Sequence, residues 1–182
     1  MATTKRRLRA MATSDLAQFR ATDDRWQLVL PVAPVPKARP KVSKWGTYYP
    51  KRTKQWMYDA AAAMASLDAY FPVSAPMFVL CVAVCHKPKN PANDFPVGDV
   101  DNFAKGILDA VTKEQIIWQD DKQVVVLIAG KRYADEDEVP HTYLEATTEL
   151  SRLDWGALWV TPHVSEDALD QEDTISLEEF TT

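Results

Sequence analysis

One amphipathic segment, residues 98–111, constrains the fold of this chain more than any other. Its apolar residues recur at the spacing of a helix: Val100, Phe103, Ala104, Ile107, Leu108 and Val111. Asp99 and Asp101 share a side only if the chain is extended before Asp101, because residues two apart point to different sides of a helix. The pattern therefore predicts a helix that begins near Asp101, with both carboxylates at its positive end.

More charged residues follow this acidic pair. Lys105 lies one helical turn after Asp101, and Asp109 lies one turn further along the same face. Asp120 and Asp121 then come directly before a β-branched, apolar run at residues 123–129, which predicts a buried strand. We expect the start of the helix and the start of this strand to meet at one place.

Carboxylates that converge without His or Cys form a hard, all-oxygen site, which suits Mg²⁺ or Mn²⁺ better than zinc. A metal ion at such a site usually binds a phosphate group, and Lys105 would neutralise charge that develops on this phosphate. The alternative is a capped helix with a solvated acidic face. The joint spacing of the acids and the lysine favours metal-assisted chemistry.

The residues that carry this pattern also carry a family signature. They are Asp99-Val100-Asp101-Asn102, Lys105, Asp109-Ala110 and Asp120-Asp121-Lys122-Gln123-Val124. The signature resembles that of the RusA family of Holliday-junction resolvases, endonucleases often encoded by phages and prophages, and the likeness extends over residues 26–150. It implies a small α+β homodimer that binds four-way DNA junctions and nicks two opposing strands symmetrically with Mg²⁺.

The resemblance also implies roles for particular residues. The metal-binding catalytic carboxylates would be Asp99, Asp101 and Asp121, and the catalytic lysine would be Lys105. Supporting positions of the motif fall on Asp120, Asp109 and Asn102. The activity would be that of a crossover junction endodeoxyribonuclease in DNA recombination and repair, in the cytoplasm of a bacterial or phage-infected cell.

The rest of the pattern predicts an α+β domain, a small mixed sheet packed by two main helices. Strands are expected at residues 26–32, 76–86, 124–133 and 142–148, the last two as an antiparallel pair joined by 134–140. The first helix should span residues 53–70, capped by Thr53. Cys81 and Cys85 lie on a strand too far apart for a disulfide, so buried free thiols are favoured over a metal site.

A basic segment precedes the first helix. Seven cations and no acid occur within residues 37–54: Lys37, Arg39, Lys41, Lys44, Lys51, Arg52 and Lys54. The four prolines within residues 34–52 exclude a continuous helix and favour a loop with a short hairpin. The interleaved Trp45, Tyr48 and Tyr49 either stack on DNA bases or cover the core. Phe95, in the proline-rich connector before the acidic helix, is likewise either a wedge at an opened junction or a packed loop aromatic.

The net charge of −5 conceals a gradient from a basic front half of the chain to an acidic rear half. We expect a flexible basic arm over residues 1–24, the nuclease domain over 25–150, and an acidic extension over 151–182 that is disordered after 164. Three interpretations of the arm remain open: a segment that contacts DNA, a targeting segment, or a solvated terminus. The extension could contact the basic surface of its own chain or a basic partner. No apolar run approaches the roughly 18 residues that span a bilayer.

Besides an interaction protein whose acidic tail engages a basic partner, two classes of function remain open on the sequence alone. The first is a Mg²⁺-dependent, structure-selective endonuclease, in which Mn²⁺ can replace Mg²⁺. The second is a non-catalytic module or regulator of the same fold that binds branched DNA. The acidic pair distinguishes them, because only the nuclease requires its carboxylates for activity.

Overall fold

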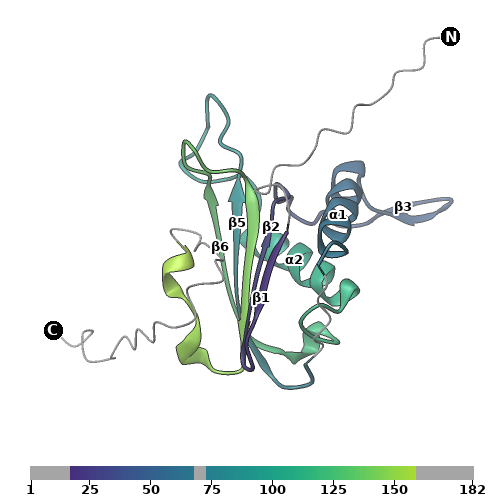
Figure 1. Ribbon diagram of the computed structural model, residues 1–182. Helices are drawn as coiled ribbons and strands as arrows, with labels where there is room; N and C mark the ends of the chain where they lie inside the picture. Colours follow the sequence, from purple (N-terminus) through teal and green to yellow (C-terminus); the bar gives the residue numbers. More distant parts are fainter. Residues whose placement is uncertain (1–16, 68–72, 159–182) are drawn as a thin grey trace, which may run out of the picture.

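The computed structural model describes residues 17–67 and 73–158 of the chain. In chain order the elements are β1 (Gln18–Ala21), β2 (Arg25–Leu30), β3 (Lys41–Ser43), β4 (Gly46–Tyr48), α1 (Lys51–Met64), β5 (Met77–Cys85), α2 (Val100–Glu114), the short helix η2 (Asp121–Gln123), β6 (Val124–Tyr133), β7 (His141–Thr147) and the short helices η3 (Leu150–Arg152) and η4 (Trp155–Leu158). A mixed sheet carries α1 and α2 on one face (Figure 1). The predicted α+β class with two main helices is confirmed.

The main sheet has the strand order β1-β2-β7-β5-β6, and only β5 and β6 run parallel. Parallel neighbours need a long crossover, which α2 supplies. The prediction that residues 124–133 and 142–148 pair with each other was wrong, because β7 lies between β2 and β5. The reason is the sequence of β5, which is apolar on both sides and therefore takes a central place with a neighbour on each edge.

The strand β6 is the edge of this sheet and is only partly covered. Val125 is 58% exposed and Leu127 is 41% exposed, whereas eight of the nine residues of β5 are buried. A buried strand was predicted at residues 123–129, and this prediction was wrong because no strand of the described chain lies on the outer side of β6. An apolar edge strand of this kind is suited to contact with another surface.

Both helices pack on the inner face through one core, which includes Trp26 of β2, Trp56 of α1 and Ile107 of α2. Helix α1 begins at Lys51, two residues before the start that the sequence predicted, and no side chain caps it. Thr53 is instead buried within the first turn. The predicted end at residue 70 lies outside the described residues, and α1 ends at Met64. In the described ranges, neither helix has the length and apolar character needed to cross a membrane.

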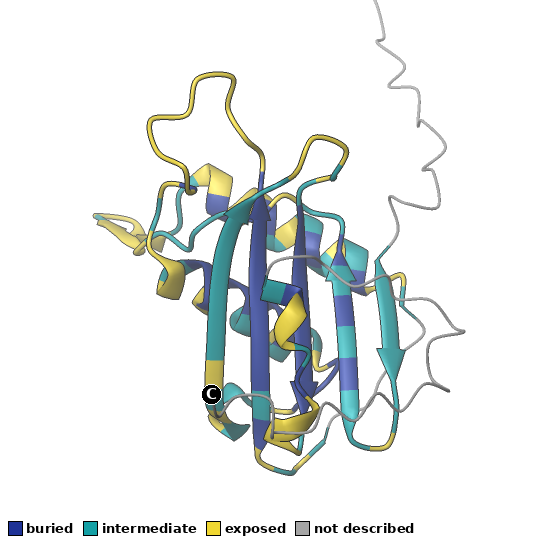
Figure 2. Cartoon of the chain, turned by 90° about the vertical axis from the view of Figure 1, so that its left-hand side faces the viewer, coloured by how far each residue is buried: buried dark blue, intermediate teal, exposed yellow. Residues whose placement is uncertain are grey.

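The opposite face of the sheet is covered by the segment that contains η3 and η4 (Figure 2). Leu153 and Ala157 are buried there against the sheet. At the other end of the domain, β1 pairs with β2. The domain therefore extends beyond the predicted limits of 25–150 on both sides, because short flanking segments complete the sheet edge and the outer core. The predicted disorder after residue 164 lies outside the described residues. Cys81 and Cys85 are buried and free, as expected.

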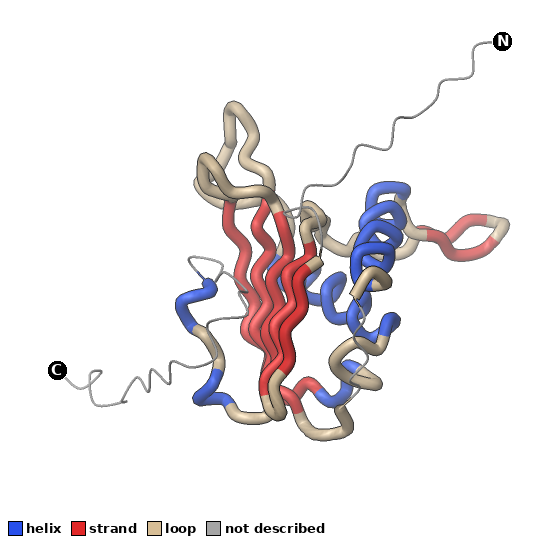
Figure 3. The backbone as a smooth tube through the Cα atoms, viewed as in Figure 1, coloured by secondary structure: helices blue, strands red, loops and turns tan. Residues whose placement is uncertain are grey.

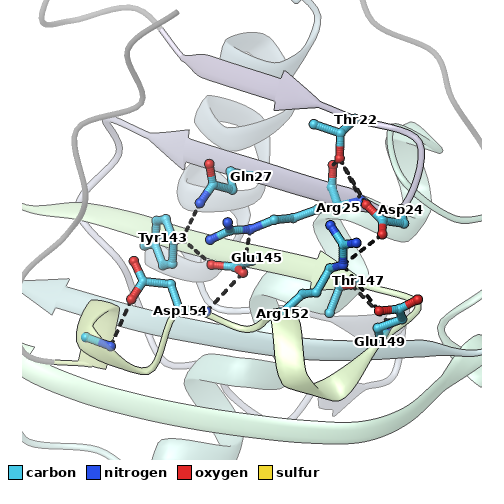
Figure 4. Close-up of polar contacts among 11 residues, drawn as sticks. Thr22, Asp24, Arg25, Gln27, Tyr143, Glu145, Thr147, Glu149, Arg152 and Asp154 are labelled. Atoms are coloured by element: carbon cyan, nitrogen blue, oxygen red, sulfur yellow. Dashed lines mark hydrogen bonds and ion pairs between the residues drawn. The ribbon is translucent and has the colours of Figure 1, made fainter. Parts of the chain in front are cut away.

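A buried polar network fastens this covering segment to the sheet (Figure 4). Glu145 of β7 is fully buried and accepts hydrogen bonds from Tyr143 Oη at 2.6 Å, Arg25 Nε at 2.9 Å and the backbone N–H of Asp154 at 3.1 Å. Burial, and then the nearby Glu145 carboxylate, raise the pKa of Tyr143 above its ordinary value, so its hydroxyl remains a donor. Every oxygen of the buried carboxylate is thus paired.

Replacing Glu145 by glutamine should destabilise the domain by about 3 kcal/mol, because Arg25 loses its buried counter-charge and the Asp154 amide can face an NH₂ group. Urea unfolding of the two proteins measures this difference. The matched control is Glu149→Gln, which breaks an exposed ion pair to Arg152 and should cost less than about 0.5 kcal/mol. Equal midpoints for the two variants would contradict the structural role of the network.

Candidate active site and nucleic-acid interface

The acidic pair lies at the start of α2, as the sequence predicted. Asp99 is the N-cap with an extended backbone, and its carbonyl accepts hydrogen bonds from the amides of Asn102 at 3.2 Å and Phe103 at 3.3 Å. Asn102 also donates from its side chain to Asp99 Oδ2 at 3.3 Å. Asp101 follows in the first turn, and both acidic residues are exposed. Both carboxylates thus lie at the positive end of the helix macrodipole, which attracts negative charge.

The chain approaches this helix through a tight backbone path. Gly98 has φ +110°, and a Cβ there would lie 3.0 Å from Pro36 and 3.3 Å from the Phe103 ring. Lys131 of β6 donates hydrogen bonds to the carbonyl oxygens of Pro96, at 2.9 Å, and Gly98. These contacts determine where the segment enters α2, and therefore where Asp99 lies.

Lys131 was missed by the sequence reasoning. Its Nζ also lies 5.4 Å from the ring centroid of Phe95, which is 56% exposed and so is not a packed core aromatic. The available signal was a charged residue within the apolar strand pattern of residues 124–133. Such a residue on the helix-facing side of a strand needs a polar partner, and two backbone carbonyls provide it.

Replacing Lys131 by methionine should loosen the start of α2, because the two carbonyls lose a charged donor. We expect local opening to become easier by about 2 kcal/mol, which speeds exchange of the Asn102 and Phe103 amides by roughly thirtyfold. Hydrogen exchange with mass spectrometry measures the effect. Lys113→Met, at the exposed far end of the same helix, is the control and should leave these amides unchanged. Equal protection in both variants would remove the positioning role of Lys131.

Asp120 and Asp121 lie at the start of η2, directly before β6. Asp120 caps η2, since its Oδ1 accepts from the amide of Lys122 at 2.9 Å and its own amide donates to Gln123 Oε1 at 3.2 Å. The Lys122 amide holds the pKa of Asp120 below its ordinary value. The Asp120 carboxylate therefore stabilises the turn, and both Asp120 and Asp121 are partly exposed.

The two acidic groups do not converge within one chain. Strands β5 and β6 point to the same end of the sheet (Figure 1), and α2 runs back between them. The start of α2 adjoins Lys131 near the end of β6, whereas Gln123 of η2 bonds to Val73 and Ala75 before β5 begins. The 15-residue length of α2 separates the groups by about 20 Å. The expected meeting of helix start and strand start was therefore wrong.

Lys105 and Asp109 follow the acidic pair along α2. Lys105 has a side chain that is 64% exposed, and its Nζ lies 4.0 Å from Asp109. Asp109 forms its closer ion pair with Lys37, whose side chain is only 13% exposed and whose amide donates to the carbonyl of Asn102 at 2.9 Å. Lys37, predicted to bind DNA, is thus a largely covered residue that anchors the segment to α2, while Lys105 remains open to solvent one turn from Asp101.

The basic segment that Lys37 anchors lies next to the acidic helix start. Its remaining cations are all exposed and lie just before the β3–β4 hairpin, on it, or at the start of α1: Arg39, Lys41, Lys44, Lys51, Arg52 and Lys54. Burial raises the pKa of the Cys85 thiol, and the charges of Lys131 and Arg52 partly offset this rise. Both cations therefore lie near Cys85, at the same end of the sheet. A polyanion held by this surface would reach the acidic pair.

The residues at the start of α2 supply carboxylates for a cation but no complete cage. Among the described residues, no three His, Cys, Asp or Glu side chains are gathered closely enough to hold a metal ion. Mg²⁺ keeps several waters and is commonly bound by one or two protein carboxylates, so Asp99 and Asp101 fit it as a pair. Asp121 of the same chain does not fit as a third ligand.

An exposed acidic pair and a lysine beside a basic surface are suited to a protein that acts on nucleic-acid phosphates. A protein-family model described as endodeoxyribonuclease RusA matches residues 31–145. The chain therefore belongs to the RusA endodeoxyribonuclease family. No curated protein matches it. The matched region begins after β2 and ends within β7, so it contains both helices, the acidic pair and the basic segment.

Proposed function

We propose that this protein is a Mg²⁺-dependent, structure-selective endonuclease that resolves Holliday junctions by paired symmetric nicks during DNA recombination or repair. One observation carries the proposal beyond family membership: Lys37 ties the basic segment to α2 through Asn102 and Asp109, next to the exposed acidic pair. Six exposed cations can thus hold a DNA backbone close to two carboxylates.

Asp99 and Asp101 are the proposed metal ligands, and Mn²⁺ would substitute for Mg²⁺ at such an oxygen site. The bound cation would polarise the scissile phosphate and activate the attacking water. Lys105, exposed one turn along the helix, would offset charge on the phosphoryl oxygens. Hydrolysis in this way would leave 5′-phosphate and 3′-hydroxyl ends.

A homodimer is part of the proposal, because cutting two opposing strands of one junction requires two symmetric sites. The exposed Val125 and Leu127 on the edge strand β6 supply an apolar surface for the partner chain. Asp121 lies directly before this edge. We therefore infer that Asp121 serves the acidic pair of the partner chain, since it lies too far from the pair in its own chain.

The test is cleavage of a labelled synthetic four-way junction and of a linear duplex of the same sequence, each with Mg²⁺ or with EDTA. We expect paired nicks on the junction with Mg²⁺, no nicks with EDTA, and little cleavage of the duplex. Because the described residues of one chain gather no three such ligands, a second candidate is a module that binds branched DNA without cutting it. Tight junction binding without nicks in either Mg²⁺ or Mn²⁺ would support that module.

A further inference from the structure

The β3–β4 hairpin presents apolar surface that the domain itself does not use. It forms a separate two-stranded sheet that protrudes from the body beside α1 (Figures 1 and 3). Trp45 at its turn is 86% exposed and Val42 is 83% exposed, the two largest values among the large apolar side chains described. Trp45 therefore does not cover the core. A two-stranded hairpin is only marginally stable alone, which suggests that a partner covers this one.

The turn presents Trp45 on a defined backbone. Ser43 Oγ donates to the carbonyl of Gly46 at 3.0 Å and accepts from the amide of Trp45 at 3.2 Å. Gly46 has φ +115°, a conformation that glycine adopts readily, and nothing lies within 4 Å of a Cβ placed there. The indole is thus held outward on a short, bonded turn.

The charges around Trp45 indicate the chemistry of its partner. Lys44 Nζ lies 5.0 Å from the centroid of the indole ring, and Arg39 and Lys41 are exposed on the same arm. No acid occurs between residues 37 and 58. An aromatic ring among cations is the combination that stacks on nucleic-acid bases while the cations contact phosphates. An acidic protein surface would satisfy the lysines but would offer no flat face to the indole.

Base faces are covered by their neighbours in a linear duplex, whereas a branch point exposes them. We propose that Trp45 stacks on a base exposed at a DNA branch point, and that the hairpin thereby favours branched over linear DNA. The inference rests on the proposed function for its substrate and assigns the recognition of branching to a residue outside the acidic site. The hairpin extends from the segment that Lys37 holds against α2, so the same DNA can reach both.

The experiment measures binding in EDTA, where no cleavage occurs, for full-length wild type, Trp45→Ala, Trp45→Phe and the control Thr47→Ala on the same exposed hairpin. Trp45→Ala should weaken binding to the four-way junction roughly tenfold while duplex binding stays within about twofold, because one base stack is lost. Trp45→Phe should retain most of the affinity, and Thr47→Ala should match wild type. A 5-iodouracil placed at the branch point should photo-crosslink to Trp45, as located by mass spectrometry.

Three results for Trp45→Ala would overturn the inference. The first is an equal loss of junction and duplex binding, and the second is junction binding as tight as that of wild type. The third is a smaller species than wild type in sedimentation, which would mean that the hairpin contacts a second copy of the chain. Because binding is measured without cleavage, a protein that nicks no junction would overturn the proposed function while the Trp45 comparison still decides the inference.

Discussion

Asp101→Asn should reduce junction cleavage by about 10³-fold, on the order of 4 kcal/mol in the barrier, with junction binding unchanged or slightly tighter. Asparagine keeps the shape of the side chain in the first turn of α2 but removes a charge that the proposed Mg²⁺ site requires. Binding should persist because an acidic group next to a phosphate contributes repulsion rather than affinity. Single-turnover cleavage of the labelled junction, together with a binding titration in EDTA, measures both quantities.

The matched control is Asp94→Asn. Asp94 is an exposed acid in the connector that leads to the same helix, and it lies outside the proposed site. Its variant should cleave at the wild-type rate. If Asp101→Asn also cleaved at that rate, the carboxylates at the start of α2 would be no more than helix caps and solvated charge, and the candidate that binds DNA without cutting it would be favoured.

The elements that the sequence predicted well are those whose pattern is local. Helix α2 begins at Val100, within one residue of the prediction, because apolar spacing and an acidic N-terminus are both properties of the segment itself. Strand β5 was predicted for the same reason, since an apolar run bounded by prolines indicates a buried strand. The neighbours of a strand, by contrast, do not depend on the local sequence alone. The loop 134–140 could join β6 and β7 as a hairpin or as an arch over the end of β5, and the structure has the arch.

The geometry of the site was harder to predict because a helix between two acidic groups moves them apart in space. Asp101 and Asp121 are close enough along the chain to suggest one cluster, yet α2 lies between them and moves the chain by 1.5 Å per residue. Lys37 shows a second limit. In the sequence it is one of seven cations, but in the fold it pairs with Asp109 of α2 and its side chain is only 13% exposed. Neither outcome could be inferred from residue type and spacing.

The separation of Asp101 from Asp121 leads to the second prediction. Inactive Asp101→Asn protein mixed with inactive Asp121→Asn protein should regain nicking activity once the chains exchange. In a mixed dimer that shares its sites across the two-fold axis, both defects fall in one site and the other site is intact. Equal mixing should restore about a quarter of the wild-type sites, since half of the dimers are mixed and half of their sites are intact. Nicked junctions should appear without paired cuts, as read on denaturing and native gels.

The control mixture combines Asp101→Asn with Asp99→Asn. These residues lie at the same helix start, so every mixed dimer carries one defect in each shared site, and no activity should return. Recovery in both mixtures would indicate residual activity rather than shared sites. If mass spectrometry detected mixed dimers but neither mixture nicked the junction, each chain would have to complete its own site. Because α2 holds Asp121 about 20 Å from the acidic pair of its own chain, that result would exclude Asp121 as a metal ligand.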